Sequence, residues 1–176
     1  MSALTPARTV TSTSRLTALT VAVAAAVVVV DQLTKSWAVN ALDDHDIDVV
    51  WTLRLHLTFN GGMAFSQGRG WGPVISVVAL VVVVVLLLSL RKGGSTLSAV
   101  AVGLVVGGAA GNVVDRIFRS GSGFLGGEVV DFIDFQWWPV FNVADAAITV
   151  GVVIAVVRSL AGSAAPTRRG TSPGAG

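Results

Sequence analysis

The sequence predicts an all-α membrane protein of four transmembrane helices with a small β-sheet on its outer, extracytoplasmic face. The chain has 176 residues, of which 53% are hydrophobic and only 12% are charged. This composition is too apolar for a soluble domain of that size. Long apolar segments predict the helices, and one segment of alternating residues predicts the sheet.

The predicted helices are apolar segments of about the 20 residues that are needed to cross a bilayer. The third segment is rich in glycine and alanine, which allows close approach to another helix. Pro139 suits the first turn of the fourth, where its missing N–H costs nothing. The four predicted spans cover about residues 16–37, 72–90, 96–114 and 139–160.

Cleavage of the first apolar segment as a signal peptide is an alternative. Four valines follow the alanines at 24–26, so a cut there would leave a hydrophobic new terminus. We therefore interpret this segment as a retained helix. The polar ends, residues 1–15 and 162–176, are expected to be disordered cytoplasmic segments on either side of one membrane domain over residues 16–161.

The segment between the first two helices predicts a strand. From Val49 to Phe59, apolar and polar residues alternate, with Trp51 on the apolar face and His56 on the polar face. A lone strand is unstable, so a small sheet lying on the membrane surface is expected within residues 40–70. His56 is interpreted as a solvated residue, with a substrate contact as the alternative.

The distribution of charge predicts that both termini are cytoplasmic. Seven basic residues then lie on the inner side and five on the outer side, in the sense of the positive-inside rule. All ten acidic residues fall at the outer face in this orientation. The chain is therefore expected to be a multi-pass membrane protein, and any site built on these acidic residues is expected near the outer face.

Composition also argues against several kinds of site. The chain has no cysteine, which excludes disulfides, thiolate metal ligands and a cysteine nucleophile. With only two histidines, a histidine-rich zinc site is not expected. The sequence pI near 9.9 comes from basic residues that flank apolar segments, so no nucleic-acid partner is predicted. No cofactor or metal is expected.

Polar residues at the outer ends of the first and third spans form two candidate clusters. Asp31 and Lys35 are four apart and share one face of a helix. They are either a structural ion pair or an active-site contact. Asp115 lies beside Arg116 and three residues after Asn112. We interpret Asp115 as a structural anchor with Arg116 as its companion, because a paired, ionised carboxylate is a poor general acid.

Two further aspartates, Asp131 and Asp145, lie at the edge of the predicted fourth span. Carboxylates there are costly and are functional candidates by default. Two of them brought together can share one proton, so that one activates water and the other protonates a carbonyl. Asn142 is placed to orient a carboxylate or a water, and Asn60 is either a turn residue or a hydrogen-bond donor to this site. Structural ion pairing and proton conduction remain alternatives.

Five short motifs follow one another over residues 31–149 of the chain. They are Asp31-Gln-Leu-Thr-Lys35, Asn60-Gly-Gly-Met-Ala-Phe65, Gly107-Gly-Ala-Ala-Gly-Asn112-Val-Val-Asp115-Arg116, Val130-Asp131-Phe132 and Phe141-Asn142-Val-Ala-Asp145. In kind and order they resemble the motifs of lipoprotein signal peptidase, also called signal peptidase II. The resemblance covers most of the chain and leaves out only its ends.

The resemblance implies a metal-free aspartyl protease of the bacterial inner membrane, with four spans and a small outer sheet. It implies cleavage of prolipoprotein signal peptides just before a cysteine that carries a diacylglyceryl lipid. Membrane lipids and globomycin-type inhibitors are the other implied partners, and a monomer is expected. Asp131 and Asp145 would be catalytic. The residues that would bind substrate or support the site are Asn60, Asn112, Arg116, Asn142, Asp31, Lys35 and Asp115.

Two departures from the family pattern affect local loops. The link from Ile117 to Glu128 is enlarged by a glycine-rich insertion, and Met63 stands where a small residue is common.

A small ion-coupled transporter and a non-catalytic scaffold are the rival hypotheses. A transporter is expected to show internal repeats, and none is seen here. A scaffold would leave the Asn and Asp clusters without a purpose.

Overall fold

The computed structural model describes residues 13–61, 81, 95–120 and 124–163. Within these residues, three helices are long and apolar enough to cross a membrane. The second predicted span, residues 72–90, lies outside the described part of the chain except for Val81. The described elements are α1 Thr13–Ala41, β1 Ile47–Val50, β2 Leu53–Asn60, α3 Thr96–Phe118, β3 Val129–Asp134 and α4 Val143–Ser163.

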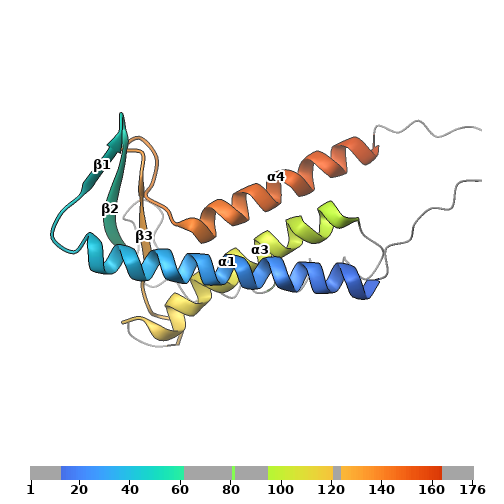
Figure 1. Cartoon of the computed structure of the whole chain (residues 1–176), viewed down its shortest axis with the longest axis horizontal. Helices are drawn as coiled ribbons and strands as arrows, with labels where there is room; N and C mark the ends of the chain where they lie inside the picture. Colours follow the sequence, from blue (N-terminus) through green and yellow to red (C-terminus); the bar gives the residue numbers. More distant parts are fainter. Residues whose placement is uncertain (1–12, 62–80, 82–94, 121–123, 164–176) are drawn as a thin grey trace, which may run out of the picture.

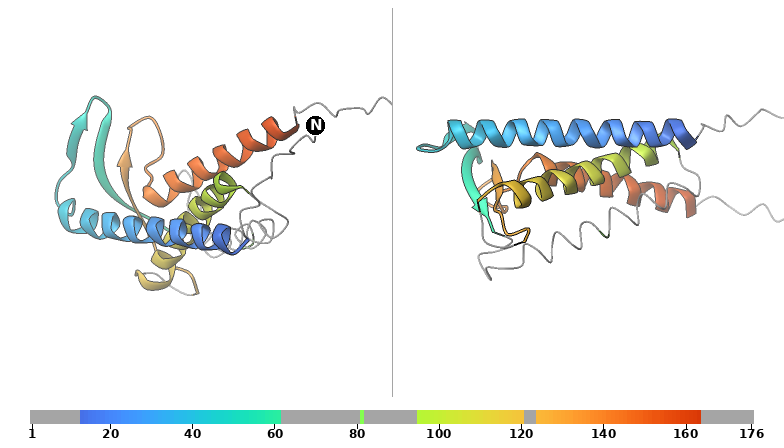
Figure 2. Two further views of the ribbon diagram at one scale, coloured as in Figure 1. Left: turned by 45° about the vertical axis from the view of Figure 1, so that its right-hand side comes forward. Right: turned by 90° about the horizontal axis from the view of Figure 1, so that it is seen from below.

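The three long helices lie side by side, with the sheet at one end of the bundle (Figures 1 and 2). Helix α3 packs against both α1 and α4. The C-terminal ends of α1 and α3 and the N-terminal end of α4 all meet the sheet (Figure 1). Residues from widely separated parts of the sequence therefore converge where helices and sheet join.

Glycines on α3 allow the close helix packing that the sequence predicts. A Cβ added at Gly107 would lie 2.7 Å from the carbonyl oxygen of Ala24 on α1. A Cβ at Gly108 would collide with the carbonyl of Ala144 on α4. The hydroxyl of Thr20 also donates a hydrogen bond across the α1–α3 contact, to the carbonyl oxygen of Ala99 at 3.1 Å. Small residues thus set the distance between α3 and both neighbours.

The helix ends differ from the sequence prediction in two useful ways. Helix α3 continues to Phe118, so Asp115 and Arg116 are helical. The expectation that Pro139 opens the last helix was wrong, because α4 begins at Val143. The Asn142 side-chain oxygen accepts a hydrogen bond from the backbone N–H of Asp145 at 3.0 Å. Asparagine is a strong N-cap residue, and this cap fixes the start of the helix.

The sheet has three antiparallel strands in the order β1-β2-β3. The prediction of one strand from Val49 to Phe59 was wrong, since a tight turn at Trp51 separates β1 from β2. Trp51 is 98% exposed and has φ of 54°. Positive φ suits a two-residue hairpin turn. The chain therefore reverses at Trp51, although the alternation of apolar and polar residues in the sequence continues through this position.

A small apolar core joins the sheet to the end of α1. Its buried members are Ala38, Leu42, Val130 and Phe132, and Leu55 of β2 packs against them. Strand β3, which the sequence analysis did not predict, therefore lies between β2 and the helices. The alternation of β3 carries Val130 and Phe132 into this core and directs Asp131 to the opposite face.

Candidate active site

Asp131 occupies the middle of β3 and is almost fully buried, with 2% exposure. It lies opposite Thr58 in the antiparallel ladder with β2. Two asparagine amides donate to its carboxyl group: Asn142 Nδ2 to Oδ1 at 2.6 Å and Asn60 Nδ2 to Oδ2 at 3.1 Å. Both carboxyl oxygens of Asp131 thus have a side-chain donor.

Asp145 lies in the first turn of α4. Its Oδ1 accepts a hydrogen bond from Asn112 Nδ2 at 2.8 Å, and its Oδ2 accepts one from the backbone N–H of Asn142 at 3.3 Å. Because Asn142 also accepts from the Asp145 backbone N–H, the two residues satisfy each other's groups reciprocally, as in a capping box. A carboxylate near a helix N-terminus is also favoured by the helix dipole.

Asn142 connects the two aspartates. It is fully buried, and it contacts Asp131 through its side-chain amide and Asp145 through its backbone N–H. The turn between β3 and α4, together with this single asparagine, brings together the two carboxyl groups that the sequence singled out.

The surroundings of Asp131 favour its protonated form. Burial, followed by the nearby charge of Asp145, raises the pKa of Asp131 to about 7, although hydrogen bonds from Asn60 and Asn142 act in the other direction. A buried carboxyl group beside a like charge is costly to ionise. Asp131 therefore holds a proton into the neutral pH range.

A buried charge cluster, formed by Asp31, Lys35 and Asp115, lies next to these aspartates. The Lys35 ammonium is 2.9 Å from a carboxylate oxygen of Asp31 and 2.9 Å from one of Asp115, and all three side chains are 0% exposed. Burial of this kind is tolerated only when the charges are paired and hydrogen-bonded. The Asp31–Lys35 pair expected from helical spacing is thus present.

The expectation that Arg116 is the companion of Asp115 was wrong. Asp115 instead contacts Lys35 and Arg119, the latter at 2.8 Å. Adjacent residues of a helix do not face each other, whereas residues four apart do. Arg116 donates to the carbonyl oxygen of Gly127 at 3.3 Å and so braces the turn that leads into β3.

The buried charge cluster also holds the backbone of the site. An oxygen of Asp31 accepts the backbone N–H of Ala144 at 3.0 Å, and an oxygen of Asp115 accepts that of Val130 at 3.2 Å. The residue before Asp131 and the residue before Asp145 are therefore both fixed to this cluster. The buried charge cluster thus connects α1, α3, α4 and β3.

Sequence reasoning missed two contacts of this cluster. Gln32 donates to an oxygen of Asp115 at 3.0 Å and to the carbonyl oxygen of Gly111 at 3.1 Å. Arg119 pairs with Asp115, as described above. The spacing of four between Asp115 and Arg119 was a readable signal, but the pairing of Gln32 needs the α1–α3 packing and has no local signature.

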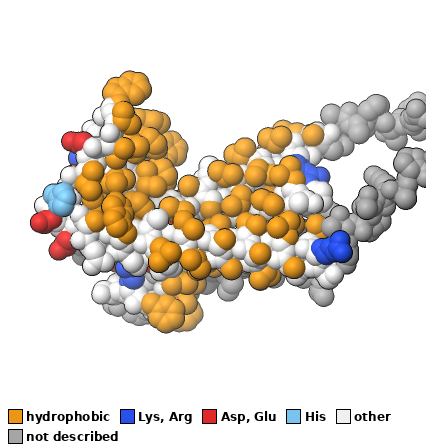
Figure 3. All heavy atoms as spheres, viewed as in Figure 1, with side chains coloured by type: hydrophobic (Ala, Val, Ile, Leu, Met, Phe, Trp, Pro, Cys, Tyr) orange, Lys and Arg blue, Asp and Glu red, His pale blue; other side chains and the backbone are white. Residues whose placement is uncertain are grey.

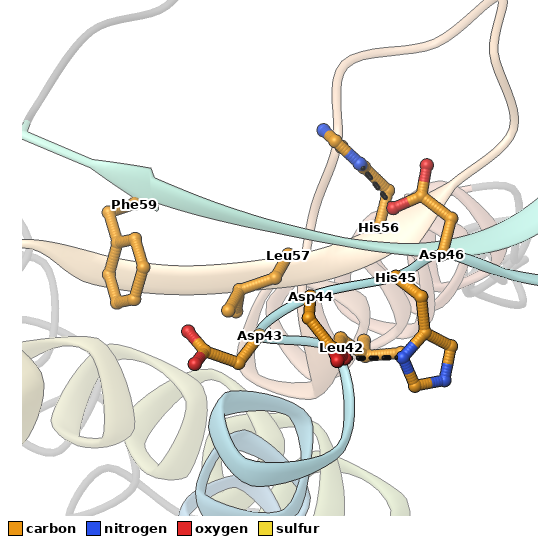
Figure 4. Close-up of a pocket in the computed structure, with 8 residues that line it drawn as sticks. All are labelled: Leu42, Asp43, Asp44, His45, Asp46, His56, Leu57 and Phe59. Atoms are coloured by element: carbon orange, nitrogen blue, oxygen red, sulfur yellow. Dashed lines mark hydrogen bonds and ion pairs between the residues drawn. The ribbon is translucent and has the colours of Figure 1, made fainter.

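A separate pocket of about 480 Å³ lies beside β2 and the loop after α1 (Figure 4). His56 is one of its lining residues and its Nδ1 lies 2.8 Å from an oxygen of Asp46, with 40% of its side chain exposed. This agrees with the interpretation of His56 as a solvated residue. Neither Asp131 nor Asp145 lines the pocket, whose wall is formed by Leu42, Asp43, Asp44, His45, Asp46, His56, Leu57 and Phe59.

Among the described residues, no group of three or more histidine, cysteine, aspartate or glutamate side chains is arranged to hold a metal ion. The residues 62–65 after Asn60 and the insertion at 121–123 lie outside the described part of the chain.

Comparison with known proteins identifies the family. A family model described as Signal peptidase (SPase) II matches residues 23–161. The chain belongs to this family. A lipoprotein signal peptidase of Mycobacterium avium (strain 104) is 41% identical over 150 residues, covering 82% of this chain and 80% of the relative. One from Rhodococcus jostii (strain RHA1) is 40% identical over 161 residues, covering 89% and 79%.

The fold agrees with this family membership. A solved structure of a bacterial membrane enzyme is similar, with a TM-score of 0.71 and 26% identity, covering 87% of this chain and 94% of that one. The resemblance read from the five motifs is thus confirmed. The protein is an aspartic peptidase of the signal peptidase II type and a multi-pass bacterial membrane protein.

Proposed function

We propose that this peptidase removes the signal peptide from prolipoproteins, and that it cuts just before a cysteine carrying a diacylglyceryl lipid. Asp131 and Asp145 are the catalytic pair. One observation carries the proposal: the buried carboxyl group of Asp131 and the half-buried one of Asp145 are hydrogen-bonded to the same buried asparagine, Asn142. The relatives, named lipoprotein signal peptidases, supply the substrate class.

The unequal surroundings of the two carboxyl groups suit general acid–base catalysis. Asp145, which receives donors on both oxygens at a helix N-terminus, takes a proton from water as the water oxygen adds to the scissile carbonyl carbon. Asp131 gives its proton to the carbonyl oxygen. When the C–N bond breaks, Asp145 passes its proton to the leaving nitrogen and Asp131 recovers one from the diol. No covalent enzyme intermediate is formed.

The shape of the molecule supports a site at the outer membrane surface. Apolar side chains cover the bundle and the side of the sheet that faces along it, whereas acidic residues and histidine gather at the far end (Figure 3). We place the sheet on the outer surface, in contact with lipids, with both termini cytoplasmic. A lipidated substrate then reaches Asp131 and Asp145 laterally from the bilayer. A monomer and inhibition by globomycin-type lipopeptides are also expected.

Replacing Asp131 or Asp145 singly with Asn tests this function. Each change removes an ionisable group but keeps the size of the side chain, so processing of a lipidated precursor is expected to stop while the protein stays folded. Asp134→Asn is the matched control. Asp134 lies on the same strand and pairs with Arg54 at 2.6 Å, so its loss should leave processing intact.

The outcomes separate clearly when precursor and product are followed by gel mobility. Normal processing by Asp131→Asn or Asp145→Asn would remove that residue from the catalytic assignment. Equal processing of a precursor whose lipidated cysteine is changed to serine would contradict the proposed substrate class.

A further inference from the structure

The amide of Asn142 has its orientation fixed by the backbone. Its Oδ1 faces the N–H of Asp145 at 3.0 Å. A backbone N–H is only a donor, so the atom that faces it must be the amide oxygen. The NH₂ group of Asn142 is thereby directed to Asp131, at 2.6 Å. The cap of α4 thus decides which end of this amide Asp131 meets.

Among its described contacts, the Asn112 side-chain oxygen has no backbone N–H partner. A lysine donates to it instead. The Lys35 Nζ lies 2.9 Å from Asn112 Oδ1. An ammonium group has donors only, so it requires the amide oxygen on its side and turns the NH₂ group toward Asp145, at 2.8 Å. The opposite orientation would place an amide oxygen against a carboxylate.

The other donor to Asn112 Oδ1 cannot fix this amide equally well. Asn142 Nδ2 lies 3.2 Å from that oxygen. It also faces Asp131 Oδ1 and the carbonyl oxygen of Val130, at 2.6 and 3.2 Å. An amide NH₂ has only two hydrogens for these three acceptors, and the short contact to Asp131 engages one of them.

The ammonium of Lys35 is itself fully satisfied. Its three donors match three acceptors at 2.9 Å each: Asp31, Asp115 and Asn112. Charge neutralisation needs only the carboxylates. The third contact is directed at a residue that touches Asp145, and it links the buried charge cluster to the proposed catalytic pair.

We propose that Lys35 is a positioning residue of the peptidase reaction, which acts by fixing the amide of Asn112 so that its NH₂ group holds the Asp145 carboxylate. This inference rests on the proposed function. Among the described residues, Lys35 makes no hydrogen bond or ion pair with Asp131 or Asp145, so its positioning effect passes through Asn112. A purely structural lysine would need the two carboxylates but would not need Asn112.

Two charge-balanced variants isolate the third contact. The Met pair combines Lys35→Met with Asp31→Asn, and the Gln pair combines Lys35→Gln with Asp31→Asn. Each pair removes one positive and one negative charge. Asn at position 31 still offers an oxygen to the Ala144 N–H. Met fills the buried space of lysine without a donor, whereas Gln retains one. Arg119→Met is the control, because it removes another cation from Asp115 without contacting Asn112.

Purified full-length variants are compared for thermal unfolding and for kcat and KM on a lipidated precursor peptide. The Met pair is expected to lose about 100-fold in kcat with KM unchanged, since misplaced catalytic groups cost about that much. The kcat of the Gln pair should be about tenfold higher than that of the Met pair, because one neutral hydrogen bond to Asn112 is restored. Arg119→Met should unfold at a lower temperature with kcat unchanged.

A cycle with Asn112→Ala decides whether Lys35 acts through Asn112. In that background, the Met pair is expected to cause no further loss of kcat. Losses that multiply, an unchanged kcat in the Met pair, or failure of both pairs to fold while Arg119→Met folds would each overturn the proposal. Full activity of Asp131→Asn or Asp145→Asn would instead contradict the proposed function itself.

Discussion

Asn142 serves the fold and the proposed chemistry with different atoms. Its side-chain oxygen caps α4 at the Asp145 N–H, and its side-chain nitrogen donates to Asp131. Because one amide supplies both contacts, substitutions that keep one atom and lose the other can separate stability from catalysis.

Asn142→Ser and Asn142→Ala are the informative pair. Serine is a good N-cap but has no second donor group that reaches Asp131, so Asn142→Ser should keep the cap of α4 while kcat falls. Alanine loses the cap as well and is expected to cost about 1 kcal/mol of additional stability. Thermal unfolding and kcat measured on both proteins check this, and equal stability of the two variants would contradict the capping role.

The raised pKa of Asp131 makes stability depend on pH. The folded protein keeps a proton on Asp131 up to about pH 7, whereas the unfolded chain loses it near the ordinary aspartate pKa of 3.8. Between these values the folded state binds more protons, so this residue's contribution to stability is complete below about pH 4 and is lost as pH rises through about 7. Each pKa unit corresponds to about 1.4 kcal/mol.

Asp131→Asn should therefore flatten the pH dependence of unfolding. The unfolding temperature of the unchanged chain is expected to fall more steeply between pH 4 and pH 7 than that of the variant. Asp134→Asn, on the same strand, should retain the original slope. Parallel curves for the unchanged chain and Asp131→Asn would show that this carboxyl group is ionised throughout the range.

The helices were predictable from the sequence, and the turns that bring the site together were not. Apolar length located the described spans, and glycine content indicated close packing of α3. The reversal at Trp51 carries no glycine or proline signal, and β3 is too short and too acidic to read as a strand in isolation. Both depend on pairing across the sheet, which a local pattern does not contain.

The residues of the site were easier to find than their partners. Asp131 and Asp145 stand out because carboxylates near apolar segments are rare. The pairing of Asp115 with Lys35 joins α3 to α1 over a long sequence separation, and only the packing of those helices reveals it. The adjacent position of Arg116 in the sequence suggested it as the partner of Asp115, but Arg116 donates to the carbonyl oxygen of Gly127.

Close packing of α3 on α1 gives a prediction for Gly107. A larger side chain would meet the Ala24 carbonyl at 2.7 Å, so Gly107→Val is expected to separate the helices and to cost about 1–3 kcal/mol or more. Val106→Leu, at the adjacent and partly exposed position, is the size control. Unfolding in detergent measures both, and equal losses would contradict a specific contact at Gly107.

At the scale of the whole molecule, the sheet and helix ends gather the polar chemistry at one end of an otherwise apolar bundle (Figures 1 and 3). The three described long helices are long and apolar enough to cross a membrane, and the proposed site lies where they meet the sheet. This arrangement suits the proposed substrate, whose lipid would lie in the bilayer and whose scissile bond would lie at its surface.

The orientation of the molecule can be measured because the chain contains no cysteine. Asp44→Cys places a thiol at a position that is 88% exposed beyond the end of α1, and Arg169→Cys places one near the C-terminus. A membrane-impermeant maleimide is expected to label position 44 on intact cells and position 169 only after permeabilisation. The reverse pattern would place the proposed site on the cytoplasmic side.

The central claim is that Asp131 and Asp145 act as one unit, and a double-substitution cycle on the purified chain tests it most directly. Groups that act together are strongly non-additive. Single Asn substitutions and the double substitution are therefore expected to lower kcat for a lipidated precursor to the same residual level. Losses that multiply in the double variant would contradict a shared role for the two carboxyl groups.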